Sequence, residues 1–184
     1  MRYKNYERFL SQIDLPFLET DDNVLAEIFR LLERKFRLQR SSKQSFIDLG
    51  SGNGKVVIYS AQNYGIRSIG IEIDPNLVKE TKETIKSLKQ DKKLSRKNLR
   101  KIKIYNGDFY TYDLTNHNYV YLYSLPTMQK YLKHVIVTAK IGTIFISHLY
   151  PLKIFNQILE LELKLNHNIY VPNKQISTYF YRRI

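Results

Sequence analysis

The chain contains no cysteine, which excludes disulfide bonds and any zinc or redox site built on thiolates. It also has no long apolar run. The longest stretch nearly free of charge, residues 141–152, is too short to cross a bilayer and is interrupted by His148 and Pro151. The first residues lead into no apolar segment of the kind that signal peptides carry. We therefore expect a cytoplasmic protein with no membrane span and no metal site.

Acidic residues are scarce, because 17 aspartates and glutamates stand against 30 lysines and arginines, and the formal net charge is +13. The excess is concentrated in residues 86–103, which we call the basic run and where Asp91 is the single acid. Its members are Lys86, Lys89, Lys92, Lys93, Arg96, Lys97, Arg100, Lys101 and Lys103. Such a run is either a solvated helix and loop or a docking surface for nucleic acid or an acidic protein.

With 184 residues, of which 43% are hydrophobic, the chain is long enough for a single domain with a substantial core. Segments with helical and strand-like apolar spacing alternate, which indicates an α/β fold with a parallel sheet. The expected helices are residues 24–36, 55–63, 75 onward, 127–138 and 151–165, and the expected strands are 45–49, 68–73, 102–105, 119–123, 143–147, 168–171 and 176–181. No helix separates the last two strands, so we expect them to form an antiparallel hairpin.

The strongest functional signal is the segment Asp48-Leu49-Gly50-Ser51-Gly52-Asn53-Gly54. A strand ends here in a turn that glycines make without steric cost, and a helix N-terminus with free N–H groups follows. Ligands of open α/β sheets bind at such turns. A dinucleotide prefers a third glycine where Lys55 stands, whereas the carboxylate of Asp48 suits a ligand with a positive end, such as S-adenosylmethionine (SAM). A dinucleotide site and a purely structural turn are the alternatives.

Two further acids follow at the ends of the next strands. Glu72, beside Ile73, can accept hydrogen bonds from both ribose hydroxyls of a nucleoside; otherwise it is an exposed acid at a strand end. Asp108 can accept the exocyclic amine of adenine, and Phe109 can pack on the base. The alternative for Asp108 is an Asx-type turn.

The segment Tyr123-Ser124-Leu125-Pro126 ends the fourth expected strand, where the fold class places the transferring methyl. It lacks the Pro-Pro-aromatic motif of enzymes that methylate the amino groups of bases. Tyr123, Ser124 and Leu125 are candidates for the walls of the slot that would hold the methyl acceptor. His148 is a candidate for orienting an acceptor amine or taking its proton, and is otherwise a core or surface histidine.

Four segments together resemble one family: Phe46 to Ile58, Gly70 to Pro75, Gly107-Asp108-Phe109 and Leu125 to Met128. This family comprises the small archaeal broad-specificity protein lysine methyltransferase and the mitochondrial lysine methyltransferases that modify the ATP synthase c-ring protein and the adenine nucleotide translocase. The resemblance implies a Rossmann-like class I methyltransferase, with a seven-stranded sheet and helices on both of its faces. It also implies SAM as the cofactor and a protein with an accessible lysine as the partner.

The resemblance extends upstream, because Pro16-Phe17-Leu18-Glu19-Thr20 is similar to a family segment that closes over the cofactor. Ser147-His148 also matches the archaeal members. Glu19 and Asn53 depart from the family, which has proline and aspartate there. The resemblance thus implies one domain, 1–184, with a cofactor-covering helical segment, 1–40, and a catalytic core, 41–184. The expected cofactor-binding residues are Pro16, Phe17, Thr20, Asp48, Gly50, Ser51, Gly52, Asn53, Gly54, Glu72, Ile73, Asp108, Phe109 and Tyr123.

Two other functions compete with lysine methylation. An RNA or rRNA methyltransferase is supported by the net charge and by Tyr105, Tyr110 and Tyr112 near the basic run. The second competing function is that of a non-catalytic module that binds SAM or nucleic acid. The intact motifs from Asp48 to Pro126 argue against this function.

Overall fold

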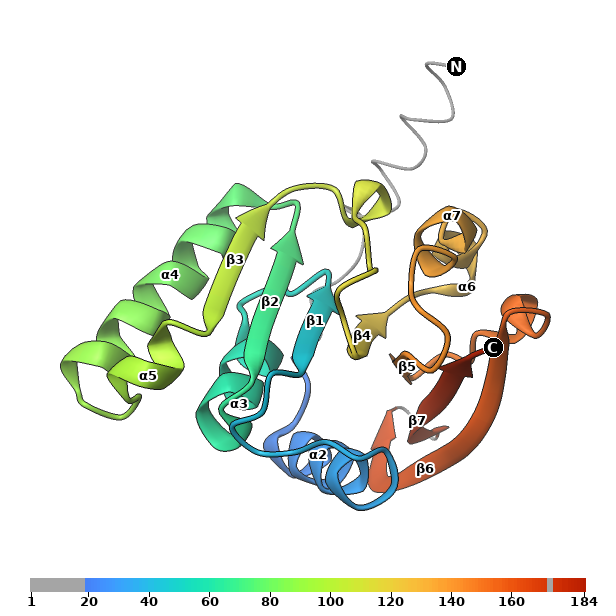
Figure 1. The fold of residues 1–184 in the computed structure, drawn as a ribbon, viewed down its shortest axis with the longest axis horizontal. Coiled ribbons are helices and arrows are strands. Elements are labelled where there is room, and N and C mark those ends of the chain that lie inside the picture. Colours follow the sequence, from blue (N-terminus) through green and yellow to red (C-terminus); the bar gives the residue numbers. More distant parts are fainter. Residues whose placement is uncertain (1–18, 172–173) are drawn as a thin grey trace.

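The computed structural model describes residues 19–171 and 174–184, and these form a seven-stranded sheet with the order β3-β2-β1-β4-β5-β7-β6. The strands are β1 (Ser45–Leu49), β2 (Arg67–Glu72), β3 (Ile102–Asn106), β4 (Tyr119–Tyr123), β5 (Ile144–His148), β6 (Leu159–Val171) and β7 (Lys174–Arg183). The first five strands are parallel, and β7 runs antiparallel between β5 and β6 (Figure 1). The carboxyl ends of the parallel strands therefore meet at one edge, where ligands of such sheets bind.

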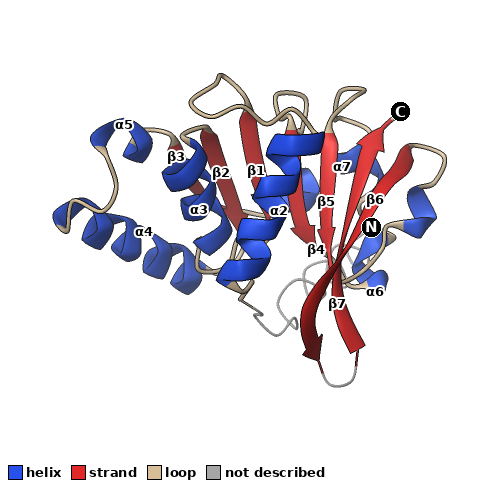
Figure 2. Cartoon of the chain, turned by 90° about the horizontal axis from the view of Figure 1, so that it is seen from below, coloured by secondary structure: helices blue, strands red, loops and turns tan. Residues whose placement is uncertain are grey.

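Helices cover both faces of the sheet, as the α/β prediction requires; α2 lies in front of it and α7 behind it in Figure 2. The helical elements are α2 (Asp22–Lys35), α3 (Lys55–Tyr64), α4 (Pro75–Gln90), α5 (Arg96–Leu99), α6 (Pro126–Gln129) and α7 (Lys133–Ile136), with 3-10 turns η1 (Phe109–Thr111) and η2 (Lys153–Phe155). Carboxylates of Asp21 and Asp74 cap α2 and α4 by accepting backbone N–H groups. In the described ranges, no helix has the length and apolar character needed to cross a membrane.

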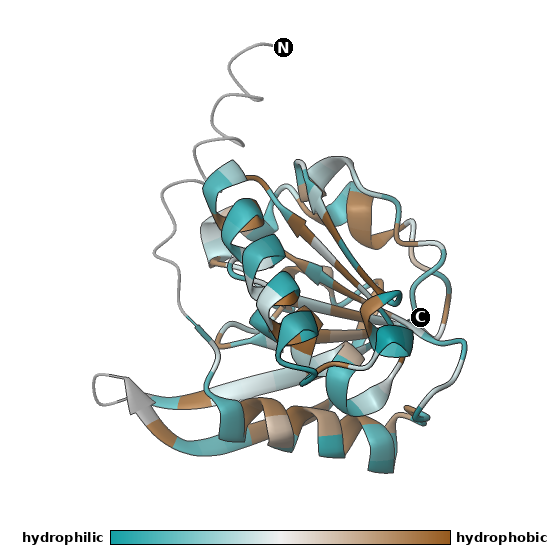
Figure 3. Cartoon of the chain, turned by 90° about the vertical axis from the view of Figure 1, so that its left-hand side faces the viewer, coloured by the Kyte–Doolittle hydropathy of each residue, from teal (hydrophilic) through white to brown (hydrophobic). Residues whose placement is uncertain are grey.

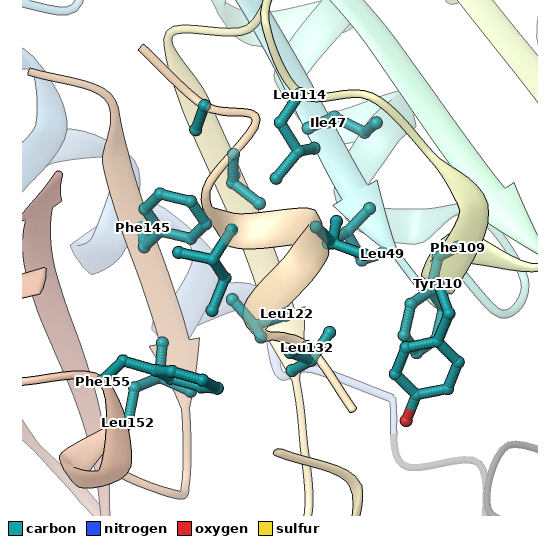
Figure 4. Packing of buried hydrophobic residues seen from close by; sticks show 14 of the residues in the cluster. Ile47, Leu49, Phe109, Tyr110, Leu114, Leu122, Leu132, Phe145, Leu152 and Phe155 are labelled. Carbon is teal, nitrogen blue, oxygen red and sulfur yellow. The ribbon is translucent and has the colours of Figure 1, made fainter. Parts of the chain in front are cut away.

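Alternating side chains of the strands fill two hydrophobic cores, one on each face of the sheet. On β4, Val120 and Leu122 pack with α6 and α7 (Figure 4), whereas Tyr119 and Tyr121 face α2 and α3. His148 ends β5 in register with Tyr123. The residues that matter below, Tyr121, Tyr123 and His148, thus share the α2 side of the sheet.

The predicted helix at residues 151–165 is wrong. Only the short turn η2 forms, and β6 begins at Leu159. The sequence Leu-Glu-Leu-Glu-Leu-Lys-Leu from Leu159 alternates with the period of a strand, and this signal was outweighed by the helical spacing before it. A register shift between Leu161 and Leu163 lets Leu159 pack in one core and Leu163 against the other.

The predicted helix at residues 127–138 is also only partly formed, because a turn at residues 130–132 separates α6 from α7. The hairpin predicted from strands 168–171 and 176–181 is confirmed as antiparallel, although both strands are longer than expected.

Candidate active site

An open cavity of about 820 Å³ lies at the edge of the sheet where β1, β2 and β4 end. It brings together predicted residues from five separate parts of the chain. Those that line it are Thr20, Asp48, Gly50, Ser51, Gly52, Asn53, Glu72, Ile73, Phe109 and Tyr123. The cavity therefore joins the segment before α2, the glycine turn, the end of β2, the turn η1 and the end of β4 in one site.

The glycine turn is held against the end of β2 by backbone hydrogen bonds. The N–H groups of Gly50 and Ser51 both donate to the carbonyl of Ile71, each at 2.9 Å. Gly50 has a left-handed φ of +85°, and a Cβ at this position would lie 3.7 Å from the ring of Phe109. The turn thus presents bare backbone beside an aromatic ring, as a nucleoside-binding site requires.

Glu72 is buried, and its carboxylate joins the turn to the chain that follows β2. One oxygen accepts the N–H of Gly52 at 2.7 Å, and the other accepts those of Ile73 and Asp74 at 2.8 and 2.9 Å. Charge-assisted bonds of this kind fix a carboxylate firmly. Glu72 is therefore held as a rigid acceptor at the wall of the cavity.

Asp48 is a buried carboxyl at the base of the cavity, 3% exposed. Burial, and then the charge of Glu72, raise the pKa of Asp48 well above its ordinary value. A cationic ligand group beside it would reverse this effect, because an opposite charge favours the ionised form. The hydroxyl of Ser51 is also buried and has no hydrogen-bond partner within the described residues. These residues fit SAM, which brings a cationic amino group and a sulfonium.

Glu19 and Asn53, the two departures from the family, lie in contact at the mouth of the cavity. The Glu19 carboxylate accepts hydrogen bonds from Lys55 Nζ at 2.6 Å and from Asn53 Nδ2 at 2.9 Å. The bond from Lys55, followed by that from Asn53, lowers the pKa of Glu19. An aspartate at position 53 would instead set two carboxylates against each other. The two departures are therefore coupled.

Other predicted residues lie outside the cavity wall or outside the described residues. Gly54 is the N-cap of α3. Asp108 caps η1, because its carboxylate accepts the N–H of Tyr110 at 2.8 Å. This is the Asx-type turn that was the alternative to an adenine contact. Ser124 is buried, and Leu125 is the N-cap of α6. None of these four is among the residues that line the cavity in the described part of the chain. Pro16 and Phe17 fall outside the described residues.

His148 is buried beside the cavity and does not line it within the described ranges. Its ring stacks on Tyr121, with centroids 6.3 Å apart, and the Tyr121 hydroxyl lies 3.0 Å from Thr20 Oγ1. Burial, and then the nearby His167, lower the pKa of His148 to about 4. Burial, and then Tyr150, raise the pKa of Tyr123 to about 12. At neutral pH this side of the site is therefore uncharged.

The sequence interpretation missed several residues of the cavity wall. They are Glu19, Leu49, Lys55, Val56, Leu77, Tyr121 and Met128. Tyr121 was within reach of prediction, because it lies two residues before Tyr123 and so on the same face of the strand. Leu77 and Met128 lie on helices, and the sequence does not determine how each helix is rotated about its own axis.

Replacing Glu72 tests its proposed contact with the ribose. Glu72→Ala is expected to weaken SAM binding by at least ~1 kcal/mol, because it removes charged hydrogen bonds both to the ligand and to Gly52. Titration calorimetry measures the change. Glu80→Ala, which removes an exposed carboxylate from α4, is the matched control. Equal affinities in the two variants would remove Glu72 from the cofactor site.

Comparison with known proteins gives a family and a fold. Residues 48–158 match the family of the ANTKMT methyltransferase domain. The chain is 31% identical over 94 residues to a lysine N-methyltransferase of Caenorhabditis elegans that is named for the C subunit of ATP synthase. This match covers 50% of the chain and 49% of the relative, so the chain spans about half the length of the curated relative that it matches.

Solved structures share the fold at low sequence identity. An RNA methyltransferase from Salinibacter ruber, in complex with S-adenosyl-L-homocysteine, has a TM-score of 0.70 and 23% identity, covering 90% of this chain and 94% of its own. The B. subtilis tRNA methyltransferase TrmK has a TM-score of 0.65 and 11% identity, covering 91% and 68%. The predicted Rossmann-like fold of class I methyltransferases is confirmed.

Proposed function

We propose that this chain, which belongs to the ANTKMT methyltransferase domain family, transfers the methyl group of SAM to a lysine side chain of a protein. The observation that carries the proposal is the family match itself, because it spans the glycine turn, Glu72, Asp108 and the segment after Tyr123. The name of the Caenorhabditis elegans relative, a lysine N-methyltransferase, supports the same acceptor.

The residues of the cavity divide between holding the cofactor and positioning the amine. Glu72 would accept the ribose hydroxyls, Phe109 would pack on the adenine, and Asp48 would pair with the cationic end. When bound, SAM supplies a methyl group activated by its sulfonium. The protein then has to align the acceptor nitrogen with that methyl, and alignment alone lowers the barrier by several kcal/mol.

The acceptor side of the cavity suits a neutral amine. A lysine ammonium, with an ordinary pKa of about 10.4, is unreactive until it loses its proton. Tyr121, Tyr123 and Met128 give this side uncharged walls, and partial desolvation there lowers the pKa of an entering ammonium. The site therefore favours the reactive form without a strong base of its own.

The tyrosines that favoured an RNA acceptor do not form a stacking surface. Tyr110 is fully buried in the core and its hydroxyl donates to the carbonyl of Met128. Tyr112 packs half-buried against the same core, whereas Tyr105 is 43% exposed on β3. Base recognition needs aromatic rings that are open to the base. This observation favours protein over RNA as the acceptor.

The site of the label decides between these acceptors. Incubation with radiolabelled SAM and fractionated host lysate is expected to place label in material that protease destroys and ribonuclease leaves intact. The rate is expected to rise with pH towards the pKa of the acceptor amine, since the neutral amine is the reactant. Label that survives protease and disappears with ribonuclease would refute the lysine acceptor and favour RNA.

The basic run is placed where it can guide an acidic segment of the protein substrate. It extends from the last turns of α4 through α5 into β3, along the edge of the sheet. Figure 3, in which this edge faces the viewer, shows that the ribbon of α4 consists mostly of hydrophilic residues. The basic side chains are exposed except for Lys101, which is partly buried and donates to the carbonyl of Gly65. We therefore place substrate docking on this surface and catalysis in the cavity.

Removing four of these charges separates docking from cofactor binding. Replacing Lys92, Lys93, Arg96 and Lys97 with serine is expected to raise the KM for the acceptor and to flatten its salt dependence, with SAM affinity unchanged. The control replaces four other exposed cations, Lys35, Lys43, Lys133 and Lys140, and so changes the net charge equally. Identical kinetics in the two variants would mean that the basic run is only solvated surface.

A further inference from the structure

A chain of buried hydrogen bonds leads from His148 to the surface of the protein. Thr178 Oγ1 lies 2.9 Å from Nδ1 of His148 and also 2.9 Å from Nε2 of His167. The other nitrogen of His167, Nδ1, lies 2.6 Å from Oε2 of Glu27. Thr178 and His167 are 0% and 1% exposed, whereas the Glu27 side chain is 41% exposed. The chain thus begins beside the cavity and ends at solvent.

The residues of this chain come from four elements that meet only in the folded protein. Glu27 lies on α2, His167 on β6, Thr178 on β7 and His148 on β5. They are set among the apolar side chains of the core on the α2 face. Buried polar groups add little net stability even when they are paired, and they cost free energy when they are not. Stability therefore does not explain a linear chain of such groups beside the cavity.

The direction of each hydrogen bond follows from Glu27. A carboxylate only accepts, so Nδ1 of His167 carries a proton and its Nε2, in the neutral ring, is an acceptor. Thr178 must then donate its single hydroxyl proton to His167, and its oxygen accepts the Nδ1 proton of His148. The chain therefore fixes the tautomer of His148 in which Nε2 carries no proton.

We propose that Thr178, His167 and Glu27 form a proton relay that draws the proton of the acceptor ammonium from His148 towards solvent. The inference rests on the proposed function, because it concerns the amine of that same site. His148 ends β5 in register with Tyr123 and against Tyr121, and both tyrosines line the cavity. Thr178, His167 and Glu27 are positioning residues, since they act through His148.

The step balances in protons and electrons. The ammonium gives one proton to Nε2 of His148, the Nδ1 proton of His148 moves to Thr178, and the hydroxyl proton of Thr178 moves to Nε2 of His167. The excess charge then rests on the His167 imidazolium, paired with the Glu27 carboxylate. The amine left by this transfer is neutral and has a free lone pair for the N–C bond; SAM, when bound, would supply the methyl group and take the S–C bonding pair back to sulfur.

The surroundings of the two rings favour this direction of transfer. In the described part of the chain, the titratable groups that face them are Glu27 of α2, Tyr121 and Tyr123 of β4, and the opposite histidine in each case. Burial, and then His167, lower the pKa of His148 to about 4, so it does not hold a proton itself. The negative charge of Glu27 stands at the far end and stabilises the proton there.

Thr178→Val tests the relay, since it removes the hydroxyl and keeps the shape of the side chain. We expect kcat at about pH 7 to fall by at least ~10-fold, which is less than the ~100-fold or more of a group that exchanges the proton directly, because Thr178 acts through His148. SAM affinity should stay within twofold of wild type. The loss should shrink to less than ~3-fold at about pH 9.5, where the amine is increasingly neutral before it binds. Thr178→Ser, which keeps the hydroxyl, should restore the wild-type pH profile.

A purely structural role for Thr178 would lower kcat by the same factor at every pH, and that result would overturn the relay. If Thr178→Val does not fold, Glu27→Gln decides, because its amide oxygen still accepts from His167 and only the charge is lost. Glu27→Gln should lower kcat only at the lower pH values. The control Glu33→Gln, on the same helix, should show no such loss. If the wild-type protein methylates RNA and no lysine, both the proposed function and the relay are overturned. If it methylates lysine and the pH profiles of both variants equal that of the wild type, the relay alone is overturned.

Discussion

An Asp48→Asn protein is expected to bind SAM far more weakly than the wild type and yet to be more stable when no ligand is present. The carboxylate is the group in the cavity that suits the cationic end of the ligand, and loss of a charged hydrogen bond costs roughly 1.5–3 kcal/mol of binding free energy. The same carboxyl is buried beside Glu72, which makes its ionised form unfavourable in the ligand-free protein. The amide has the same shape and no charge to bury.

The gain in stability should depend on pH. Because folding raises the pKa of Asp48, the folded state retains a proton that the unfolded chain releases. Wild-type stability is therefore complete below the unfolded pKa, near 3.9, and falls as the pH rises through the raised folded value. Above that value, Asp48→Asn should exceed the wild type by roughly 1–3 kcal/mol, the cost of an uncompensated buried polar group.

Urea unfolding at several pH values, together with calorimetry of SAM binding, measures both effects. Asp91→Asn removes an exposed carboxylate and should change neither quantity. A less stable Asp48→Asn protein with unaltered affinity for SAM would show that this carboxyl is a structural acceptor and has no role at the ligand.

Gly54→Ala should be strongly destabilising, and more so than Gly50→Ala, where an added Cβ would meet only the ring of Phe109 at 3.7 Å. Gly54 has a left-handed φ of +74°, and an added Cβ would lie 2.2 Å from Cγ2 of Thr81. Thr81 is fully buried and its hydroxyl donates to the carbonyls of Leu77 and Gly52, so it cannot move aside without losing these bonds. Backbone strain of about 1–2 kcal/mol and overpacking of about 1–3 kcal/mol should add.

Gly142→Ala provides a matched control for this substitution. Gly142 has a φ of +89°, and a Cβ there would meet no atom within 4 Å, so only the backbone strain is incurred. The midpoint temperature of thermal unfolding should therefore be well below that of Gly142→Ala in the Gly54→Ala protein. Adding Thr81→Ser, which deletes the clashing methyl, should recover part of the difference. Equal losses at the two glycines would contradict the close packing of the turn on α4.

Local features of the sequence were sufficient to predict the parallel strands and many of the residues that line the cavity. The turn from Asp48 to Gly54, the end of β2 at Glu72 and the aromatic Phe109 lie at strand ends, and parallel topology alone brings them together. The helix predicted after Pro151 failed because the strand period from Leu159 begins within a segment that also has helical spacing. Tertiary pairing with β7 decided between them.

The environment of His148 could not be predicted, because its partners are distant in the sequence. Thr178 lies 30 residues from His148, and Glu27 lies 140 residues from His167. No local pattern marks such contacts, which depend on the register of β5, β6 and β7 and on the rotation of α2. For the same reason the pairing of Glu19 with Asn53, 34 residues apart, looked like two unrelated departures until the structure joined them.

Identification of the atom that receives the methyl group decides whether the protein is a lysine methyltransferase. The protein would be incubated with host lysate and SAM carrying an isotopically heavy methyl group, with Asp48→Asn as the control of low activity. Mass spectrometry would then locate the heavy methyl in digested protein and in digested RNA. We expect heavy methyl groups on lysine Nζ in the wild-type reaction and strongly reduced amounts in the control. Heavy methyl groups on nucleosides, with none on lysine, would contradict this expectation.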